Sequence, residues 1–336
     1  MLKIKSLTLK NYAGFMDPVT FDFTRPDGSF KPVNAFFGPN GCGKSTGLNA
    51  ISMLCKARQY INRVPGQNNL LLRKMQFNKD YDPTYFGFMK YEGQMEVRGV
   101  FADSDKELIV EIKDDEVVRN DLADRSYDNC AHIDADHPMS MKKFQVPYSR
   151  IDLFLDLAHT IYGYPCYVDK IVNSNGVEGT NKMLDGAVKT YFNNHQKIIT
   201  EKVNTGLTSQ EIYKMINRDT AKDPNAFYQD FVLVKGDVKV HHKSMSDGEK
   251  KIATLLRNLC DPVVMDRSDI VLIDNIEMHV YFKRHTKMLD KFRTVFPDKQ
   301  FIVTSHSGTL LDHVGSSYGM DCLYDISAIK GQPLTE

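Results

Sequence analysis

A nine-residue segment, GPNGCGKST at positions 38–46, constrains the fold of this chain more than any other part of its sequence. It satisfies the pattern G-x-x-x-x-G-K-[ST], in which glycines let the backbone close around phosphate groups and the N–H groups at a helix start face their negative charge. The apolar segment VNAFF precedes it at 33–37, and residues 44–56 have the composition of a helix. A glycine-rich turn that merely opens a helix is the alternative. Strand, loop and helix in this order predict an α/β fold that binds a nucleotide.

Several residues of this segment have predicted roles in binding the nucleotide. The ammonium group of Lys44 is expected to reach the outer phosphates, and the hydroxyl group of Ser45 is expected to ligate Mg²⁺. Gly38 and Gly43 supply the permissive backbone of the loop. ATP and Mg²⁺ are therefore the cofactors that the sequence predicts.

An acidic residue follows a second apolar segment. Residues 270–273 are all apolar, and Asp274 comes directly after them. A buried strand of a parallel sheet delivers such a carboxylate to the carboxyl edge of the sheet, where Asp274 is expected to be the second group that holds Mg²⁺. A helix cap after a buried strand is the alternative. The next residue is Asn275, at a position where nucleotide-hydrolysing proteins usually have a glutamate that positions water.

Composition excludes several classes of partner. Lysine plus arginine and aspartate plus glutamate both number 43, so no net charge draws the chain to nucleic acid or to an anionic membrane, and any DNA contact must be local. The six cysteines include no C-x-x-C pair, which is typical of reduced intracellular proteins. No apolar run approaches the roughly 18 residues of a membrane helix, and no signal-peptide core is present. We therefore expect a cytoplasmic protein without a membrane partner.

Hydrophobic patterning predicts the remaining elements. Alternation of apolar and polar residues predicts antiparallel strands at 95–101 and 107–112, and helical spacing predicts a helix at 149–161. The segment TSQE at 208–211 matches a capping box before another helix. Further helices are expected from residue 246 and at 282–295. The other expected strands are 2–10, 19–23, 230–240, 270–273 and 301–306, the last three in a parallel sheet.

These elements predict a nucleotide-binding core that is split along the chain. The core is expected at residues 1–60 and 230–336. An antiparallel side-sheet region is expected at 61–145, and a helical lobe at 146–229.

The segment KSMSDGEKKIATLL at 243–256 contains a capping box, with Ser246 as the N-cap and Glu249 three residues further on. A helix start is the simplest interpretation of this pattern. In the alternative interpretation, the Ser246 hydroxyl group, the Gly248 backbone and the helix N-terminus form a second anion site. That site would grip the γ-phosphate of a nucleotide held by another copy of the chain.

The segment MSDGE at 245–249 resembles the signature motif of ABC-type ATPases. With GPNGCGKST, LIDNIEMH at 272–279 and VTSH at 303–306, it completes the motif set of that family in the expected order. The chain resembles the branch of SMC, RecF and OLD-like ATPases more than the transporters, because of its opening LKIKSLTLKNYAGFMDPVTFDF, its DNIEMH motif and the long separation between Ser45 and Ser246. The resemblance implies an α/β fold, a P-loop ABC-type ATPase head with a largely parallel core sheet, an antiparallel side sheet and a helical lobe.

The resemblance also implies roles for individual residues. Ser246, Gly248 and Glu249 would act on the ATP bound by the partner copy. The residues implied to hold the phosphates and Mg²⁺ are Asn40, Gly41, Gly43, Lys44, Ser45 and Thr46.

Two further positions follow from the same resemblance. His306 would be the switch histidine that senses the γ-phosphate, unless it merely caps the next helix. Gln145 matches the loop glutamine of the family, which contacts both the nucleotide and Mg²⁺, and Gln67, Gln76 and Gln94 compete for that assignment.

Asn275 predicts slow hydrolysis. An amide orients water by hydrogen bonds but cannot take its proton. Glu277, which matches a second glutamate of the family, is one candidate for the missing carboxylate. Alternatively, the substitution gives a long-lived ATP-bound dimer, or a partner completes the site. The predicted catalytic residues are Asp274, Asn275, Glu277 and His306.

Two weaker patterns leave alternatives open. Metal-ligand residue types alternate in CAHIDADHP at 130–138, but a polar strand face is the commoner cause of such a pattern. Basic residues recur at helical spacing in YFKRHTKMLDKFR at 281–293, as a solvated face or as a patch that contacts DNA or a partner. The candidate metal cluster consists of Cys130, His132, Asp134, Asp136 and His137. The basic residues are Lys283, Arg284, Lys287 and Lys291.

The predicted function is that of an ATP-dependent switch. Two copies, or a higher oligomer, would sandwich ATP between the cradle of one head and the signature of the other. Because neither a long coiled coil nor the nuclease domain of OLD-like proteins is expected, a separate effector such as a nuclease or toxin would receive the signal, in DNA repair or anti-phage defence. A transport ATPase subunit and a non-hydrolysing ATP-dependent scaffold are the alternatives.

Overall fold

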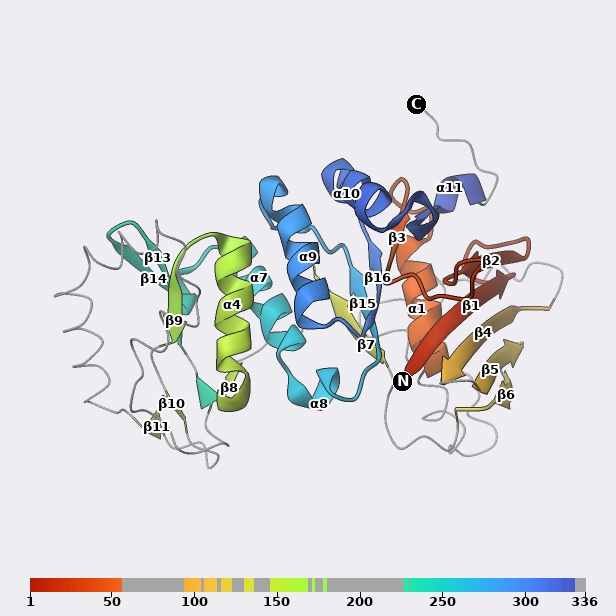
Figure 1. Ribbon diagram of the computed structural model, residues 1–336, viewed down its shortest axis with the longest axis horizontal. Helices are drawn as coiled ribbons and strands as arrows, with labels where there is room; N and C mark the ends of the chain where they lie inside the picture. The colour runs from red at the N-terminus through yellow and green to blue at the C-terminus, as the bar shows by residue number, and fades with distance from the viewer. Residues whose placement is uncertain are drawn as a thin grey trace, which may run out of the picture. The chain divides into compact units, whose positions relative to one another are not determined.

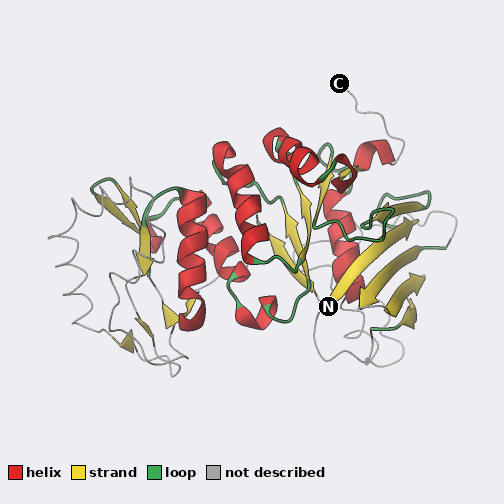
Figure 2. Ribbon diagram, in the orientation of Figure 1, coloured by secondary structure: helices red, strands yellow, loops and turns green. Residues whose placement is uncertain are grey.

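The chain forms two compact units, which Figures 1 and 2 show as ribbons. The first unit consists of Met1–Asp134, Arg267–Ile276 and Asp298–Glu336, and the second of Ala135–Asp266 and Glu277–Pro297. The computed structural model describes residues 1–55, 94–103, 106–113, 116–122, 130–135, 146–168, 171–172, 178–179, 227–228 and 230–329.

Five parallel strands form the core sheet of the first unit, and every neighbouring pair in it is parallel. Two of its three inner strands, β15 (Ile270–Asp274) and β16 (Gln300–Thr304), are buried at every position, which explains why they show no alternation of apolar and polar residues. Since parallel strands end at the same edge, the segments that follow them are brought together there. The strand order is β17 (Leu323–Asp325), β3 (Val33–Phe37), β16 (Gln300–Thr304), β15 (Ile270–Asp274) and β7 (Cys130–Asp134).

A second sheet of the first unit is antiparallel throughout and confirms the strands expected at 95–101 and 107–112. Its first strand alternates between buried and half-buried residues along most of its length, as expected for a sheet with one face on the core. The strand order is β2 (Val19–Asp22), β1 (Leu2–Lys10), β4 (Glu96–Asp103), β5 (Lys106–Lys113) and β6 (Glu116–Asn120).

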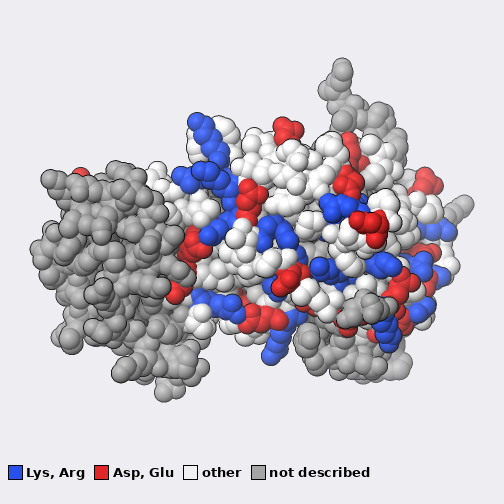
Figure 3. Space-filling model, in the orientation of Figure 1, with Lys and Arg blue, Asp and Glu red and all other residues white. Residues whose placement is uncertain are grey.

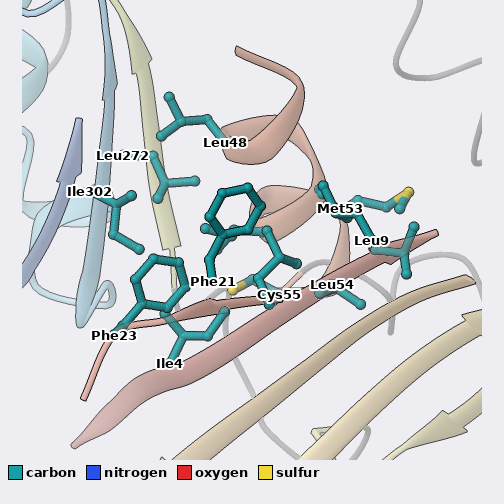
Figure 4. Close-up of a cluster of buried hydrophobic side chains, with 14 of the residues drawn as sticks. Ile4, Leu9, Phe21, Phe23, Leu48, Met53, Leu54, Cys55, Leu272 and Ile302 are labelled. Atoms are coloured by element: carbon teal, nitrogen blue, oxygen red, sulfur yellow. The ribbon is translucent and has the colours of Figure 1, made fainter. Parts of the chain in front are cut away.

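Helix α1 (Lys44–Cys55) is held between the two sheets of the first unit by a hydrophobic cluster. Figure 4 shows Leu48 of this helix beside Leu272 of β15, with Phe21 of β2 and Ile302 of β16 in the same cluster. All four side chains are at most 1% exposed. Full burial of such a side chain stabilises the fold by about 1.5–3 kcal/mol. The cluster therefore fixes α1, and with it the loop at 38–43 that precedes the helix.

Short helices complete the first unit after β16. Helix α10 (Gly308–Tyr318) is followed by the 3-10 turn η4 (Met320–Cys322), and α11 (Ile326–Ile329) follows β17. Strand β17 is anchored by the hydroxyl group of Tyr324, which accepts a hydrogen bond at 3.1 Å from the buried ammonium group of Lys31.

The second unit contains four helices and two small antiparallel sheets within the described ranges. Helix α4 packs against α7 and α9, and an ion pair of 2.6 Å joins Lys291 of α9 to Asp156 of α4. The helices are α4 (Ile151–Tyr162), α7 (Asp247–Leu259), α8 (Pro262–Met265) and α9 (His285–Val295). The 3-10 turns are η1 (Tyr148–Arg150), η2 (His242–Ser244) and η3 (Phe282–Arg284).

One small sheet has the order β14 (Val238–His241), β13 (Phe231–Lys235) and β9 (Cys166–Val168). The other has the order β11 (Glu178–Gly179), β10 (Ile171–Val172), β12 (Phe227–Tyr228) and β8 (Val146–Pro147).

The expectation that residues 230–240 belong to the parallel sheet was wrong. They form an antiparallel hairpin, because Gly236 has a φ of 61° and allows a two-residue turn in which Lys235 pairs with Val238. Strand β7 lies in the region that was predicted as the side sheet, but it forms an edge strand of the parallel sheet. The two compact units have other boundaries than residues 60, 145 and 229, and the predicted division into core, side sheet and helical lobe stays a prediction.

Other expected elements are present. The helices at 149–161 and from residue 246 correspond to α4 and α7, and that at 282–295 to η3 and α9. The capping-box match at 208–211 lies outside the described residues. None of the helices in the described ranges combines the length and the apolar character needed to cross a membrane.

Candidate functional site

The predicted site residues of the first unit gather at the carboxyl edge of the parallel sheet. Asp274 of β15 is in register with Asp134 of β7, and Thr304 of β16 is in register with Phe36 of β3. The phosphate loop follows β3 directly. The sheet therefore brings the loop, Asp274, Asn275 and the segment after β16 to one edge, although they are far apart in the sequence (Figure 1).

Asp274 and Thr304 also share the face of the sheet that α1 covers. Leu272 and Ile302 belong to the cluster that packs on α1, and each lies two residues earlier on the same strand. Because strand side chains alternate between faces, Asp274 and Thr304 project to that same side. Ser45, in the first turn of α1, begins the helix on this side of the sheet.

The phosphate loop has the backbone conformation that its glycines predict. Gly38, Gly41 and Gly43 have φ angles of 135°, 77° and 108°. An added Cβ atom at Gly38 would lie 3.0 Å from the Sγ atom of Cys42 and 3.2 Å from a Ser327 hydroxyl group. The loop is thus compact and needs glycine where it turns.

Lys44 is folded onto the loop in this structure. Its ammonium group donates hydrogen bonds to the carbonyl oxygens of Gly38 at 3.0 Å and of Pro39 at 2.9 Å, and the residue is only 6% exposed. Asn40, Gly41 and Ser45 are exposed around it, and Thr46 is half-buried. The cation therefore sits inside the loop, where phosphate groups would meet it.

A hydrogen-bonded turn joins the ends of β15 and β16. The N–H group of Asn275 donates to the hydroxyl oxygen of Thr304 at 2.7 Å, and that hydroxyl group is also bonded to Oδ1 of Asp274. The N–H group of Ile276 donates to the carbonyl oxygen of Thr304 at 3.1 Å. Asp274 is 8% exposed and Thr304 is fully buried.

Asn275 adopts a left-handed backbone conformation, with a φ of 51°. This conformation is uncommon for residues other than glycine, and asparagine and aspartate are enriched in it. The backbone therefore gives a reason for asparagine at this position that is independent of hydrolysis. Sequence patterns of apolar residues cannot reveal such a turn.

His306 is exposed beyond the end of β16 and does not cap the next helix. Ser307 is the N-cap of α10, because its hydroxyl oxygen accepts a hydrogen bond of 3.2 Å from the N–H group of Leu310. Ser305 holds the backbone on either side: its N–H group donates to the Phe36 carbonyl oxygen at 3.1 Å and its hydroxyl oxygen accepts from Ser307 at 3.0 Å. The capping alternative for His306 was therefore wrong, and its role as a switch stays a prediction.

In the second unit, the signature segment forms the capping box that the sequence predicts. The Ser246 hydroxyl group accepts from the Glu249 N–H group at 3.4 Å, and the Glu249 carboxylate accepts from the Ser246 N–H group at 3.0 Å. The same carboxylate accepts from the Ser246 hydroxyl group at 2.9 Å and forms an ion pair with Lys235 of β13. Ser246 is exposed at the start of α7.

The charge of Glu249 is stabilised by these contacts. Burial acts to raise its pKa, but the hydrogen bonds from Lys235 and Ser246 outweigh it, so that the pKa of Glu249 lies below its ordinary value. The hydroxyl group of Tyr162 of α4 also donates to the Glu249 carbonyl oxygen, and burial raises the pKa of Tyr162 well above its usual range. The signature helix is consequently anchored to both α4 and β13 within the second unit.

The last three residues of the DNIEMH motif, from Glu277 to His279, lie in the second unit. His279 is exposed, has a φ of 66°, and lies 3.4 Å from the position that a Cβ atom on Gly248 would take. Glu277 is half-buried, and its carbonyl oxygen accepts from the Val280 N–H group at 3.1 Å. Glu277 as a substitute base therefore stays a prediction.

The weaker sequence patterns receive only partial support. Cys130 is buried in the core cluster, and no group of three metal-ligand side chains exists among the described residues, whereas Asp136 and His137 lie outside them. Gln145, Gln67 and Gln76 also lie outside the described residues. Gln94 lies two residues before the antiparallel strand β4, which begins at Glu96.

The basic residues at 283–291 do not form one free helix face. Lys283 lies in η3 before α9 begins, Lys291 pairs with Asp156, and Arg284 donates to the Thr160 carbonyl oxygen at 3.2 Å. Figure 3 shows positive and negative side chains interspersed over the described part of the face that it presents.

Several known proteins are similar to this chain. A family model described as AAA domain matches residues 6–237. Among curated proteins, the Retron Vc95 probable ATPase of Vibrio cholerae serotype O1 biovar El Tor is 24% identical over 149 residues. The alignment covers 42% of this chain and 27% of that protein, so the chain spans about a quarter of the length of this relative.

Solved structures resemble the chain only distantly. The SMC head domain from Thermotoga maritima has a TM-score of 0.47 and 15% identity, covering 93% of this chain and 92% of that one. A structure of the recombination mediator protein RecF has a TM-score of 0.42 and 12% identity, covering 92% of this chain and 94% of that one. The family match spans most of the chain and includes the loop at 38–46. The chain therefore belongs to the AAA domain family, and its phosphate loop makes it a member of the P-loop ATPase type.

Proposed function

We propose that this protein binds ATP with Mg²⁺, hydrolyses it slowly, and dimerises around it to control a separate partner. The carboxyl edge of the parallel sheet is the observation that carries this proposal. It gathers the glycine loop, Lys44, Asp274 and Asn275 in one unit, as a site for a nucleoside triphosphate requires.

The residues present suit Mg²⁺. The Ser45 hydroxyl group is exposed in the first turn of α1, and the Asp274 carboxylate lies on the same side of the sheet with one oxygen held by Thr304. Oxygen ligands of this kind are those that Mg²⁺ prefers. When bound, the metal would neutralise charge on the phosphates. Lys44 would exchange its two loop carbonyls for phosphate oxygens.

Slow hydrolysis follows from Asn275. Its side chain carries an amide, which can orient a water molecule but cannot accept a proton from it. Positioning supplies much of the catalysis of phosphoryl transfer, so turnover is reduced rather than abolished. Glu277 is the candidate for the indirect base.

The exposed signature supports dimerisation. Ser246, at the start of α7, is exposed, and the helix N-terminus favours an anion. In the proposed dimer, Ser246 and Gly248 of one copy contact the γ-phosphate held by Lys44 of the other, and His306 senses that phosphate. A higher oligomer would repeat this contact.

A relative named as a probable retron ATPase supports a role beside other components. Together with the resemblance to the SMC, RecF and OLD-like branch, it favours a separate effector, such as a nuclease or toxin, in anti-phage defence or DNA repair. Because the chain has no net charge, any direct contact with DNA in this proposal would be made by a local surface.

Single-turnover hydrolysis of labelled ATP, with molecular mass measured in parallel, tests the proposal. We expect the wild type to form an ATP-dependent dimer and to hydrolyse ATP slowly. Loss of hydrolysis in Glu277→Gln, with binding retained, would assign the base to Glu277. Intact ATP in a stable wild-type dimer would instead make the protein a binding switch, and a wild type that binds no ATP would refute the proposal.

Two alternatives give different results in simple experiments. A transport ATPase subunit would fractionate with membranes, whereas we expect the protein in a soluble complex with its effector. A non-hydrolysing scaffold would show the same ATP affinity and the same oligomeric state in the wild type and in Ser246→Arg.

A further inference from the structure

Thr304 makes more contacts with the proposed magnesium site than its place in the VTSH motif suggests. It is fully buried at the end of β16. Its hydroxyl group contacts both Asp274 and Asn275, and its carbonyl oxygen accepts from Ile276. One residue therefore binds three consecutive residues at the end of the neighbouring strand.

Hydrogen-bond chemistry fixes the direction of these contacts. The backbone N–H group of Asn275 can only donate, so the Thr304 hydroxyl oxygen accepts from it at 2.7 Å. A hydroxyl group has one proton, and this proton is then directed to Oδ1 of Asp274. Oδ1 of Asp274 is therefore the acceptor in this bond.

This bond also fixes the rotation of the Asp274 side chain. With Oδ1 occupied by Thr304, Oδ2 is the oxygen that accepts no hydrogen bond from the described residues. It is thus the oxygen offered to a cation. A ligand held in one orientation loses less conformational freedom when the cation binds.

The same hydroxyl group holds the turn after the strand. Asn275 has a φ of 51°, and the bonds from its N–H group and from that of Ile276 both end on Thr304. These bonds determine where the backbone goes after Asp274 and hence where the Asn275 amide is presented.

We propose that Thr304 is a positioning residue that orients Asp274 toward Mg²⁺ and fixes the turn at Asn275. This inference rests on the proposed binding of ATP with Mg²⁺. It assigns Thr304 no contact with the nucleotide, because the residue acts through Asp274 and Asn275.

Thr304→Val and Thr304→Ser separate the hydroxyl group from the packing. Valine has nearly the shape of threonine without the hydroxyl group, and serine keeps the hydroxyl group without the methyl group. Thr304→Cys, which keeps a weak donor, is the second variant if the valine protein does not fold, and we expect it to lie between serine and valine. The melting temperature of each variant reports folding.

The main measurement is the affinity for a fluorescent ATP analogue, titrated with Mg²⁺ and repeated in EDTA. In Thr304→Val, the Mg²⁺ concentration for half-maximal tightening of binding should rise about tenfold or more, the effect of losing a hydrogen bond to a charged group. Affinity in EDTA should stay within about twofold of the wild type, because the cradle is intact. Thr304→Ser should restore the Mg²⁺ dependence.

Two outcomes overturn the inference alone, provided that the wild type binds the analogue and responds to Mg²⁺. One is a wild-type Mg²⁺ dependence in Thr304→Val, or in Thr304→Cys if valine does not fold. The other is an equal loss of affinity with Mg²⁺ and in EDTA, which would indicate a purely structural role. A wild type that binds no nucleotide overturns the proposed function, and this inference with it.

Discussion

The phosphate cradle of the first unit and the signature of the second unit are both proposed anion sites at helix starts, but they are built differently. The cradle follows a buried parallel strand, and the ammonium group of Lys44 in it donates to two loop carbonyl oxygens, from Gly38 and Pro39. In the signature, Ser246 is bonded to its own Glu249, which is paired with Lys235. In the cradle, phosphate would compete with neutral carbonyl oxygens for Lys44, whereas at the signature it would compete with the Glu249 carboxylate for Ser246. ATP affinity should therefore come from the cradle, and the signature should decide only whether two copies join.

The largest expected effect is that of Lys44→Ala. Loss of charge-assisted bonds to the phosphates should weaken ATP binding by about 100-fold or more. Isothermal titration with ATP and Mg²⁺ measures this change. Lys10→Ala, on β1 of the antiparallel sheet, is the control and should bind normally. Wild-type affinity in Lys44→Ala would show that the cradle is not the nucleotide site.

The complementary variant at the signature is Ser246→Arg. A long side chain at the start of α7 should prevent the ATP-dependent dimer and leave ATP affinity within about twofold of the wild type. Light scattering with and without ATP reads the oligomeric state. Ser244→Arg, exposed in η2 two residues earlier, is the control. If Ser246→Arg still forms the ATP-dependent dimer, the signature does not decide whether two copies join.

Asn275 can be tested with two carboxylates. Asn275→Asp tolerates the left-handed backbone, and Asn275→Glu supplies the usual residue at a strain of about 1 kcal/mol. A carboxylate near the water should raise the single-turnover rate by about tenfold or more. We expect lower thermal stability in Asn275→Glu than in Asn275→Asp. Unchanged rates in both variants would show that position 275 does not limit hydrolysis.

Alanine substitutions at two glycines compare how tightly the phosphate cradle and the signature are packed. Gly47 lies in α1 after the cradle, and Gly248 lies in α7 at the signature. A Cβ atom at Gly47 would lie 2.6 Å from the Phe36 ring, whereas one at Gly248 would lie 3.4 Å from His279. Gly47→Ala should therefore destabilise the protein by about 1–3 kcal/mol in urea unfolding. Gly248→Ala should leave stability nearly unchanged. Equal effects would mean that the two helix starts are packed alike.

The smallest effect concerns pH at the signature. The pKa of Glu249 is lowered in the folded protein, so the stability that its charge contributes is present above its ordinary pKa and is lost as pH falls through the folded value. Below about pH 4, the wild type should lose its small advantage in melting temperature over Glu249→Gln. Glu249 is only half-buried, so that solvent still screens its charge, and the difference should be small. A constant difference between pH 7 and pH 3 would exclude this contribution.

Local patterns in the sequence were sufficient for much of the fold and for the candidate site residues. The glycine loop, the buried strand before Asp274, the capping box of Ser246 and the alternating strands at 95–112 each depend on neighbouring residues. Each of these patterns extends over no more than one turn, one strand or one pair of neighbouring strands in the sequence. The family match supports the recognition that these motifs gave.

The assignment of residues 230–240 failed for a physical reason. An apolar strand has no sequence signal for the strand that it pairs with, and the two-residue turn at Gly236 decided between parallel and antiparallel pairing. Strand β7 was missed as a core strand because its mixture of polar and apolar residues resembled a metal cluster. Cys130 lies in the core and Asp134 at the carboxyl edge of the same strand.

The sequence by itself determined which groups are available for the chemistry: Lys44, Ser45, Asp274, and an amide instead of a carboxylate at position 275. Only the tertiary structure decided how they are held. The bonds that Thr304 makes to Asp274, Asn275 and Ile276 join residues 28 to 30 positions apart in the chain, and they hold the left-handed turn at Asn275. Contacts of that kind depend on strand order and register, which arise from packing of the whole sheet and not from any local pattern.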